Sequence, residues 1–272
     1  MNWYKHERIS EHITRIIDIA GVACYLIEGN EKACLLDTCC GYGNLKEYVS
    51  SLTDKELFVI LTHGHYDHVG SAVFFEKVYM NPLDMPVLEA HKAGREHFLE
   101  EDKKIIPALK DITYDMVNPF PENEPIAIAD GDEFDLGDLT IQMISVPGHS
   151  PGMMCALIKE ERTMVYGDAC GMNVLLRDEF ASCVSEYRNA LLKLKQFDSE
   201  YDTILRNHGS YTNDKRLLDN VLECCDEILA HKDDHHPVAM YSETLYEAKL
   251  SNHGVREDGK KGNIIYKEEK RR

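Results

Sequence analysis

The segment THGHYDH, residues 62–68, is the densest group of side chains in this sequence that could do chemistry. It holds three histidines and one aspartate, which are His63, His65, Asp67 and His68. Imidazole and carboxylate are good ligands for zinc and related divalent ions. Residues two apart in an extended segment face the same side, so His63 and His65 could bind one ion. Asp67 and His68 follow the turn and could reach a second ion. The alternative is a polar loop that is rich in histidine by chance, which this density at the end of an apolar run disfavours.

Three further residues of the same kind stand at comparable places in the chain. His149 lies in VPGHSPG, Asp168 in VYGDA and His208 in ILRNHG, each just after an apolar run and next to a glycine. Strand ends and the loops after them are where α/β folds usually gather their sites. Alone, each residue would more often have a structural role. Together with the histidine segment they make a set of seven candidate ligands.

Seven ligands suit two ions. We expect each ion to take its own set of three, and these are His63, His65 and His149 for one and Asp67, His68 and His208 for the other. Asp168 would bridge both ions. A water shared by two such ions loses a proton near neutral pH, and the bridging hydroxide attacks a carbonyl or phosphoryl centre. Asp67 and Asp168 are therefore the predicted catalytic residues, with Asp67 able to carry the proton.

The elements that must position these residues are short apolar strands separated by helical patterns. Four helices are predicted, at 45–51, 70–75, 185–197 and 214–231, from apolar positions three or four apart. The predicted strands, rich in Val, Ile, Leu and Tyr, are 22–28, 33–37, 57–62, 139–146, 153–158, 163–166 and 203–205. Strands and helices in mixed order indicate an α/β layered fold.

Residues 81–125 interrupt this order. Their helical character at 87–109 and the proline-rich NPFPENEP indicate an insertion in a domain that spans 1–235. Long insertions often shape a binding pocket. The alternative is a surface segment that has no role in binding. Residues 236–272 are expected to form a C-terminal extension that packs on the same domain, with one strand at 263–266.

Composition limits the partners. The net charge of −18 repels phosphate backbones, so the expected partner is a small-molecule substrate and not a nucleic acid. No apolar run suits a membrane span or an export signal, so we expect a cytoplasmic protein without membrane attachment. In that compartment the nine cysteines are expected to be reduced and mostly buried. Nothing in the sequence indicates an oligomeric state.

The combined motifs resemble the metallo-β-lactamase superfamily. Its HxHxDH motif reads here as HGHYDH, and its PGH, GD and final HG motifs read as PGHSPG, YGDA and NHG, over about residues 20–230. The resemblance implies a four-layer αββα sandwich with the metals at one edge. Asp37 matches the aspartate of the family's LIDTG-like turn and would hold a metal ligand by a hydrogen bond; a turn-capping role is the alternative. Cys39 stands where the family usually has glycine.

The resemblance implies a dinuclear metallo-hydrolase that cleaves an ester, thioester or lactone. Its cofactors would be two Zn²⁺, with Mn²⁺ or Fe²⁺ as alternatives. The alternative functions are a mononuclear-iron persulfide dioxygenase, a β-lactam or phosphodiester hydrolase of the same fold, and a binding module without activity. His65, where the flavodiiron branch has glutamate, argues against that branch. Acyl-homoserine lactonases often have a tyrosine shortly after the bridging aspartate, and here Cys170 and Gly171 follow Asp168.

Other residues are less informative. Tyr211, three residues after His208, could line the pocket or donate to an oxyanion, or it could simply pack before the next helix. Cys170 is expected to pack or to begin a helix. Histidines that lie away from the strand ends are expected on exposed helices or loops, and these are His91, His97, His231, His235, His236 and His253.

Overall fold

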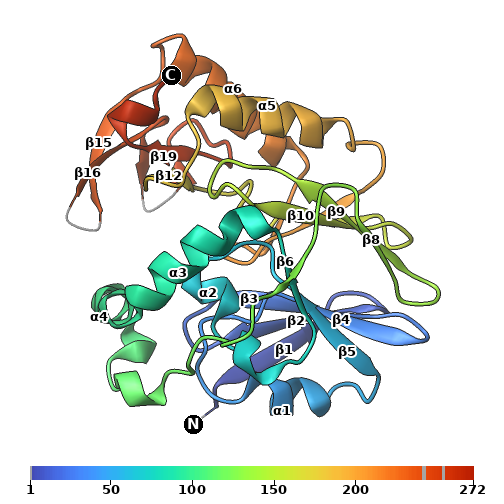
Figure 1. The fold of residues 1–272 in the computed structure, drawn as a ribbon. Helices are drawn as coiled ribbons and strands as arrows, with labels where there is room; N and C mark the ends of the chain where they lie inside the picture. The colour runs from blue at the N-terminus through green and yellow to red at the C-terminus, as the bar shows by residue number, and fades with distance from the viewer. Residues whose placement is uncertain (1, 241–242, 253–254) are drawn as a thin grey trace. The chain divides into compact units, whose positions relative to one another are not determined.

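The computed structural model describes residues 2–240, 243–252 and 255–272, and most of its strands belong to two large sheets. The chain divides into two units, Met1–Gln142 and Met143–Arg272. Each unit contains sheet strands and helices (Figure 1). Within the described ranges, no helix is long and apolar enough to cross a membrane.

The first sheet has seven strands in chain order. They are β1 (Tyr4–Arg8), β2 (Ile13–Asp18), β3 (Ala23–Glu28), β4 (Lys32–Leu36), β5 (Glu56–Ile60), β6 (Val78–Met80) and β7 (Ile126–Ala127). The first four pair antiparallel, and β4 to β7 pair parallel. Because β4 and β5 are parallel, the residues that follow them emerge at the same edge of the sheet.

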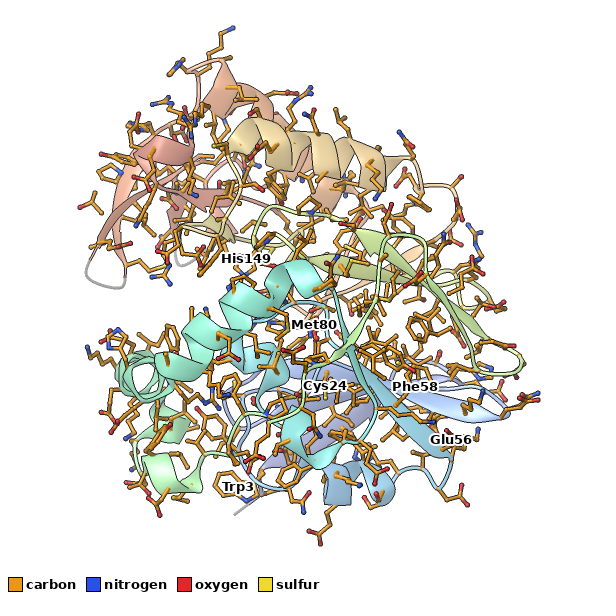
Figure 2. All side chains as sticks on the ribbon, in the orientation of Figure 1. Trp3, Cys24, Glu56, Phe58, Met80 and His149 are labelled. Atoms are coloured by element: carbon orange, nitrogen blue, oxygen red, sulfur yellow. The ribbon has the colours of Figure 1, made fainter. Side chains whose placement is uncertain are left out.

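Burial explains why these segments form strands. In β3 every residue from Ala23 to Ile27 is fully buried, so both faces of the strand are covered. Along β5 the chain passes from exposed Glu56 to buried Phe58, both labelled in Figure 2. The sequence analysis did not predict β1, β2, β6 and β7 of this sheet. In β1 the reason is plain, because this strand is polar and mostly exposed and lacks an apolar run.

The helices of the first unit are short. They are α1 (Leu45–Ser50), α2 (Tyr66–Val69), α3 (Met85–Ala93) and α4 (Arg95–Ile105). Asn44 caps α1, because its side-chain oxygen accepts the backbone N–H of Glu47 at 3.1 Å. The expected helix at 70–75 is wrong in extent: α2 ends at Val69, and only a 3₁₀ turn, Ala72–Phe74, follows. Apolar residues three or four apart over so short a segment fit a 3₁₀ turn as well as an α-helix. The helical character predicted within 87–109 is confirmed by α3 and α4.

The second large sheet has the order β14-β13-β11-β10-β9-β8. Its strands are β8 (Glu133–Asp135), β9 (Thr140–Ser145), β10 (Met154–Ile158), β11 (Thr163–Val165), β13 (Thr203–Leu205) and β14 (Thr212–Asn213). The helices of the second unit, α5 (Val184–Lys195) and α6 (Arg216–Leu229), share one apolar core with β10, β11 and β13. Because β11 and β13 pair parallel, the residues that follow them also emerge at one edge.

The C-terminal residues form smaller sheets. A four-stranded sheet has the order β12-β19-β16-β15, with the strands β12 (Val174–Leu176), β15 (His236–Met240), β16 (Glu243–Glu247) and β19 (Ile264–Tyr266). A two-stranded sheet pairs β17 (Ser251–Asn252) with β18 (Val255–Arg256). The strand expected at 263–266 is confirmed as β19, which pairs parallel with β12. The division of the chain into 1–235 and 236–272 stays a prediction.

Candidate metal centre

The first group of candidate ligands follows β5, after the buried residues Leu61 and Thr62. His63, His65 and His68 are all buried. The ring centroid of His63 lies 4.7 Å from that of His65 and 4.0 Å from that of His68. The structure therefore brings together three imidazoles that the sequence separates by only a few residues.

Asp37 joins this group from the turn after β4. Its carboxylate accepts the backbone N–H of Thr62 at 2.7 Å, the hydroxyl of Thr62 at 2.8 Å and Nδ1–H of His68 at 2.9 Å. Since Nδ1 of His68 is the donor, Nε2 carries the lone pair, and it lies 3.7 Å from Oδ2 of half-buried Asp67. Asp37 thus makes the hydrogen bond to a candidate ligand that we expected of it.

The turn after β4 keeps a left-handed backbone although it lacks the family's glycine. Asp37 has a φ of 63° and Cys39 a φ of 55°. Gly70 makes the close packing of this turn feasible, because a Cβ there would lie 2.2 Å from the carbonyl carbon of Cys40. The N–H of Gly70 donates to the carbonyl of Cys39 at 2.9 Å. The turn is therefore tied directly to the segment that carries His68.

The second group follows strands of the other large sheet. Nδ1–H of His149 donates to the carbonyl of Leu175 at 2.9 Å, which leaves the lone pair on Nε2. This Nε2 lies 3.7 Å from Oδ2 of Asp168, and Nε2 of His208 lies 3.3 Å from the same oxygen. Asp168 and His208 follow the parallel strands β11 and β13, which explains why they meet.

Both groups offer ligand types that suit a divalent metal ion. Ligand atoms about 2.0–2.2 Å from a shared zinc lie about 3–4 Å from one another. The Nε2–Oδ2 distances of 3.7 Å for His68 and Asp67, 3.7 Å for His149 and Asp168, and 3.3 Å for His208 and Asp168 fall in this range. His68 and His149 each donate Nδ1–H to an oxygen, the arrangement that usually fixes the tautomer of a metal-binding histidine. The donors are imidazoles and carboxylates only, and these suit zinc, manganese and iron.

The family of the chain follows from comparison with known proteins. Residues 18–201 match the family model described as the metallo-beta-lactamase superfamily. The chain belongs to the metallo-β-lactamase superfamily. Its predicted class, a hydrolase of this fold, is confirmed by that membership together with thioesterase-named relatives.

The relatives of this chain include proteins that carry thioesterase names. The human acyl-coenzyme A thioesterase MBLAC2 is 25% identical over 191 residues, which cover 62% of this chain and 67% of the human protein. The atrochrysone carboxyl ACP thioesterase of Aspergillus fumigatus is 24% identical over 156 residues, which cover 56% of this chain and 41% of that protein.

Solved structures confirm the α/β fold of the metallo-β-lactamase type. A metallo-β-lactamase from Pontibacter korlensis gives a TM-score of 0.62 at 14% identity, covering 82% of this chain and 99% of its own. The sec-alkylsulfatase Pisa1 from a Pseudomonas species gives a TM-score of 0.67 at 11% identity. The match covers 84% of this chain and 42% of the sulfatase chain. Each unit of this chain has a sheet and helices, which are the layers that an αββα sandwich requires.

Two residues that the sequence analysis missed support the second group. Gly148 of the PGH motif packs against Tyr187 of α5, so closely that a Cβ would lie 2.1 Å from the tyrosine ring. The hydroxyl of Tyr187 donates to the carbonyl of Ala169 at 2.7 Å. Burial raises the pKa of Tyr187, which keeps this hydroxyl protonated. The glycine of the motif was the available signal for such a contact.

Arg206 is the second missed residue. It is buried, and its Nη2 donates to the carbonyl of His208 at 2.9 Å while Nη1 donates to Oδ1 of Asn213 at 3.1 Å. Its backbone N–H donates to the carbonyl of Tyr211 at 2.7 Å. A charged residue inside an apolar strand end was the signal. Tyr211 itself is half-buried with a φ of 46°, and its role toward substrate stays a prediction.

The sequence-based expectation is wrong for one histidine. His91 was expected on an exposed helix or loop, but it is buried on α3, where its ring stacks on His65. His97 and His231 are exposed as expected. His236 is exposed too, but it lies on strand β15 and not on a helix or loop. His235 is half-buried and stacks on Tyr246, and His253 lies outside the described residues.

Proposed function

We propose that this chain is a metal-dependent hydrolase of acyl thioesters that holds two divalent metal ions, with zinc as the first candidate. Membership of the superfamily and the thioesterase names of two relatives support this proposal. The seven residues proposed to bind the ions are His63, His65, Asp67, His68, His149, Asp168 and His208.

The position of one carboxylate oxygen carries the proposal. Oδ2 of Asp168 lies within 3.7 Å of Nε2 of His149 and within 3.3 Å of Nε2 of His208. These two histidines belong to different predicted ligand sets. An oxygen beside both is what a carboxylate that bridges two ions requires.

The first group also holds residues of both predicted sets. The ring of His63 lies 4.7 Å from that of His65, of its own set, and 4.0 Å from that of His68, of the other set. Asp67 lies beside His68, of its own set. Each group therefore offers ligands for each of two ions. A single ion would need only three or four of these residues.

Bound ions would supply a Lewis acid for the thioester carbonyl and would lower the pKa of a water to about 7. The chain's own residues then have separate tasks. Asp67, which is half-buried, accepts the proton of the attacking water at its carboxylate and passes it on. Asp37 holds the ring of His68, and the carbonyl of Leu175 holds the ring of His149.

The substrate proposed is the acyl thioester, whatever its thiol carrier. A thiolate is a weaker base and a better leaving group than an alkoxide. Cleavage of a thioester therefore needs no strong acid among the carboxylates to protonate the leaving group. Coenzyme A and acidic carrier proteins are anionic, and the chain has a net charge of −18. A neutral acyl thioester of N-acetylcysteamine is therefore a useful probe beside an acyl-coenzyme A.

A test compares the wild type with Asp168→Asn, with Asp111→Asn at an exposed position as the matched control. Metal content is measured by elemental analysis, and hydrolysis is followed by thiol release. We expect about two metals in the wild type and in Asp111→Asn, and loss of metal and of thiol release in Asp168→Asn. Thioester hydrolysis that survives complete removal of metal from the wild type would contradict the proposal. So would iron-dependent oxygen uptake with a persulfide in place of thioester cleavage.

A further inference from the structure

The inserted helical segment makes three hydrogen bonds to the histidine segment. Oδ2 of Asp84 accepts the backbone N–H of Gly64 at 2.8 Å, and Nδ1 of His91 accepts the backbone N–H of Tyr66 at 3.1 Å. Oδ2 of Asp102 accepts the hydroxyl of Tyr66 at 2.6 Å. The three acceptors come from the start of α3, from α3 itself and from α4. All of these residues lie in the first unit.

Close packing reinforces these hydrogen bonds. A Cβ at Gly64 would lie 2.7 Å from the carbonyl oxygen of Asp84 and 2.9 Å from the backbone nitrogen of Leu88. Both are backbone atoms and cannot move away cheaply. The start of α3 therefore lies directly against the backbone between His63 and His65.

His91 also contacts a candidate ligand through its ring. The ring centroids of His91 and His65 lie 4.3 Å apart with an interplanar angle of 17°. The ring of Phe98 lies 4.6 Å from that of His91, and it stacks in turn on Tyr66 at 4.9 Å. Stacking on the two rings of His65 and Phe98 restricts the rotation of His91, and a restricted His91 restricts His65.

The tautomer of His91 follows from its hydrogen bond. A backbone N–H can only donate, so Nδ1 of His91 is unprotonated and a neutral ring carries its proton on Nε2. The same side chain thus contacts the ring of His65 and fixes the backbone of the next residue. A phenylalanine would keep the first contact and an asparagine the second, but neither would keep both.

We propose that His91 is a positioning residue that sets the ring plane of His65 for metal binding, and that the insertion braces the histidine segment. The inference rests on the proposed function, because it assumes that His65 binds a metal. It gives the insertion a task other than the pocket wall expected from the sequence. A partner that orients a metal ligand typically changes metal affinity about 10- to 100-fold when it is removed.

The experiment compares His91→Ala, His91→Phe and His91→Asn with the wild type, and uses exposed His97→Ala of α4 as the matched control. Metal affinity is measured by chelator competition, and the coordination by the visible spectrum of the cobalt-substituted protein. Thermal unfolding of each metal-free variant reports the purely structural cost.

We expect His91→Ala to weaken metal binding about 10-fold or more and to change the cobalt spectrum. His91→Phe and His91→Asn should each recover part of the affinity, and His97→Ala should match the wild type. An affinity and a spectrum of His91→Ala equal to the wild type would overturn the inference while leaving the proposed function intact. A wild type that binds no metal would instead defeat the proposed function and the inference with it.

Discussion

At the scale of single residues, Asp37 does the most to organise the first group of candidate ligands. Its two carboxylate oxygens accept three hydrogen bonds, from the backbone and hydroxyl of Thr62 and from His68. A carboxylate that is fully buried is stable only when its oxygens are satisfied in this way. Thr62 belongs to the histidine segment, so its backbone hydrogen bond joins the turn of Asp37 to that segment and is no evidence for a turn-capping role.

Asp37→Asn should weaken metal binding with little change to the backbone. Asparagine tolerates the left-handed φ of 63° found here, but its amide lacks the charge that orients Nδ1–H of His68. We expect metal affinity to fall about 10- to 100-fold. Chelator competition measures it, and an unchanged affinity would show that Asp37 acts on the turn alone.

The thiols allow a second prediction at this scale. All nine cysteines are free, and eight are buried, as the sequence led us to expect, while Cys183 is half-buried. Burial raises the pKa of Cys170 and Cys224 to about 12, so these thiols are protonated and unreactive at neutral pH. A chromogenic disulfide reagent should titrate about one thiol rapidly in the native protein. Cys183→Ser should remove that phase, and several rapidly reacting thiols in this variant would contradict the burial found here.

At the scale of elements, strand ends and the inserted helices divide the work of building the site. Parallel neighbours place Asp37 with the histidine segment, and Asp168 with His208. Helices α3 and α4 then pack against the histidine segment. The side of a helix that is buried depends on its partner in space, and this is why the sequence could not predict that His91 is buried.

The hydrogen bond from Tyr66 to Asp102 of α4 leads to a prediction on pH. Burial, with the negative charge of Asp67 nearby, raises the pKa of Asp102 to about 6, against the opposing effects of the Tyr66 hydrogen bond and of Arg95. The folded state therefore binds this proton more tightly than the unfolded chain does. The stability that protonated Asp102 contributes has its full value below about pH 4 and is lost as the pH rises through about 6.

Asp102→Asn should remove this part of the pH dependence. Its amide oxygen can still accept the hydroxyl of Tyr66, and it carries no charge at any pH. Relative to the variant, the wild type should lose stability between about pH 4 and 6. Urea unfolding across that range measures the difference, and parallel curves for the two proteins would contradict it.

At the scale of the whole molecule, the sequence predicted the α/β fold and eight of the nineteen strands in the described residues, because apolar runs bounded by Gly, Asp or Pro leave few alternatives. It could not predict β1, which is exposed, or the supporting contacts of Tyr187 and Arg206. The contact of Tyr187 depends on which side of α5 is buried, and those of Arg206 depend on how the chain from Arg206 to Asn213 folds back on itself. The candidate ligands were predictable because they follow strand ends and their residue types are limited by chemistry.

The net charge of −18 makes a prediction about substrates. An acidic protein repels the phosphates of coenzyme A, and salt screens this repulsion, since the Debye length falls from about 30 Å at 0.01 M to about 8 Å at 0.15 M. We therefore expect kcat/KM for an acyl-coenzyme A to rise over that range of salt. The value for the neutral N-acetylcysteamine thioester should stay constant. A fall with salt for the coenzyme A substrate would instead indicate a local basic site that binds its phosphates.

The most direct test of the central claim is a metal titration of the metal-free protein, with thioester hydrolysis as the readout. The proposed set of seven ligands predicts that the rate rises with added zinc and reaches its plateau at about two equivalents. Asp168→Asn should not reach that plateau. Full hydrolysis by the metal-free protein, or a rate that added metal does not change, would contradict the account.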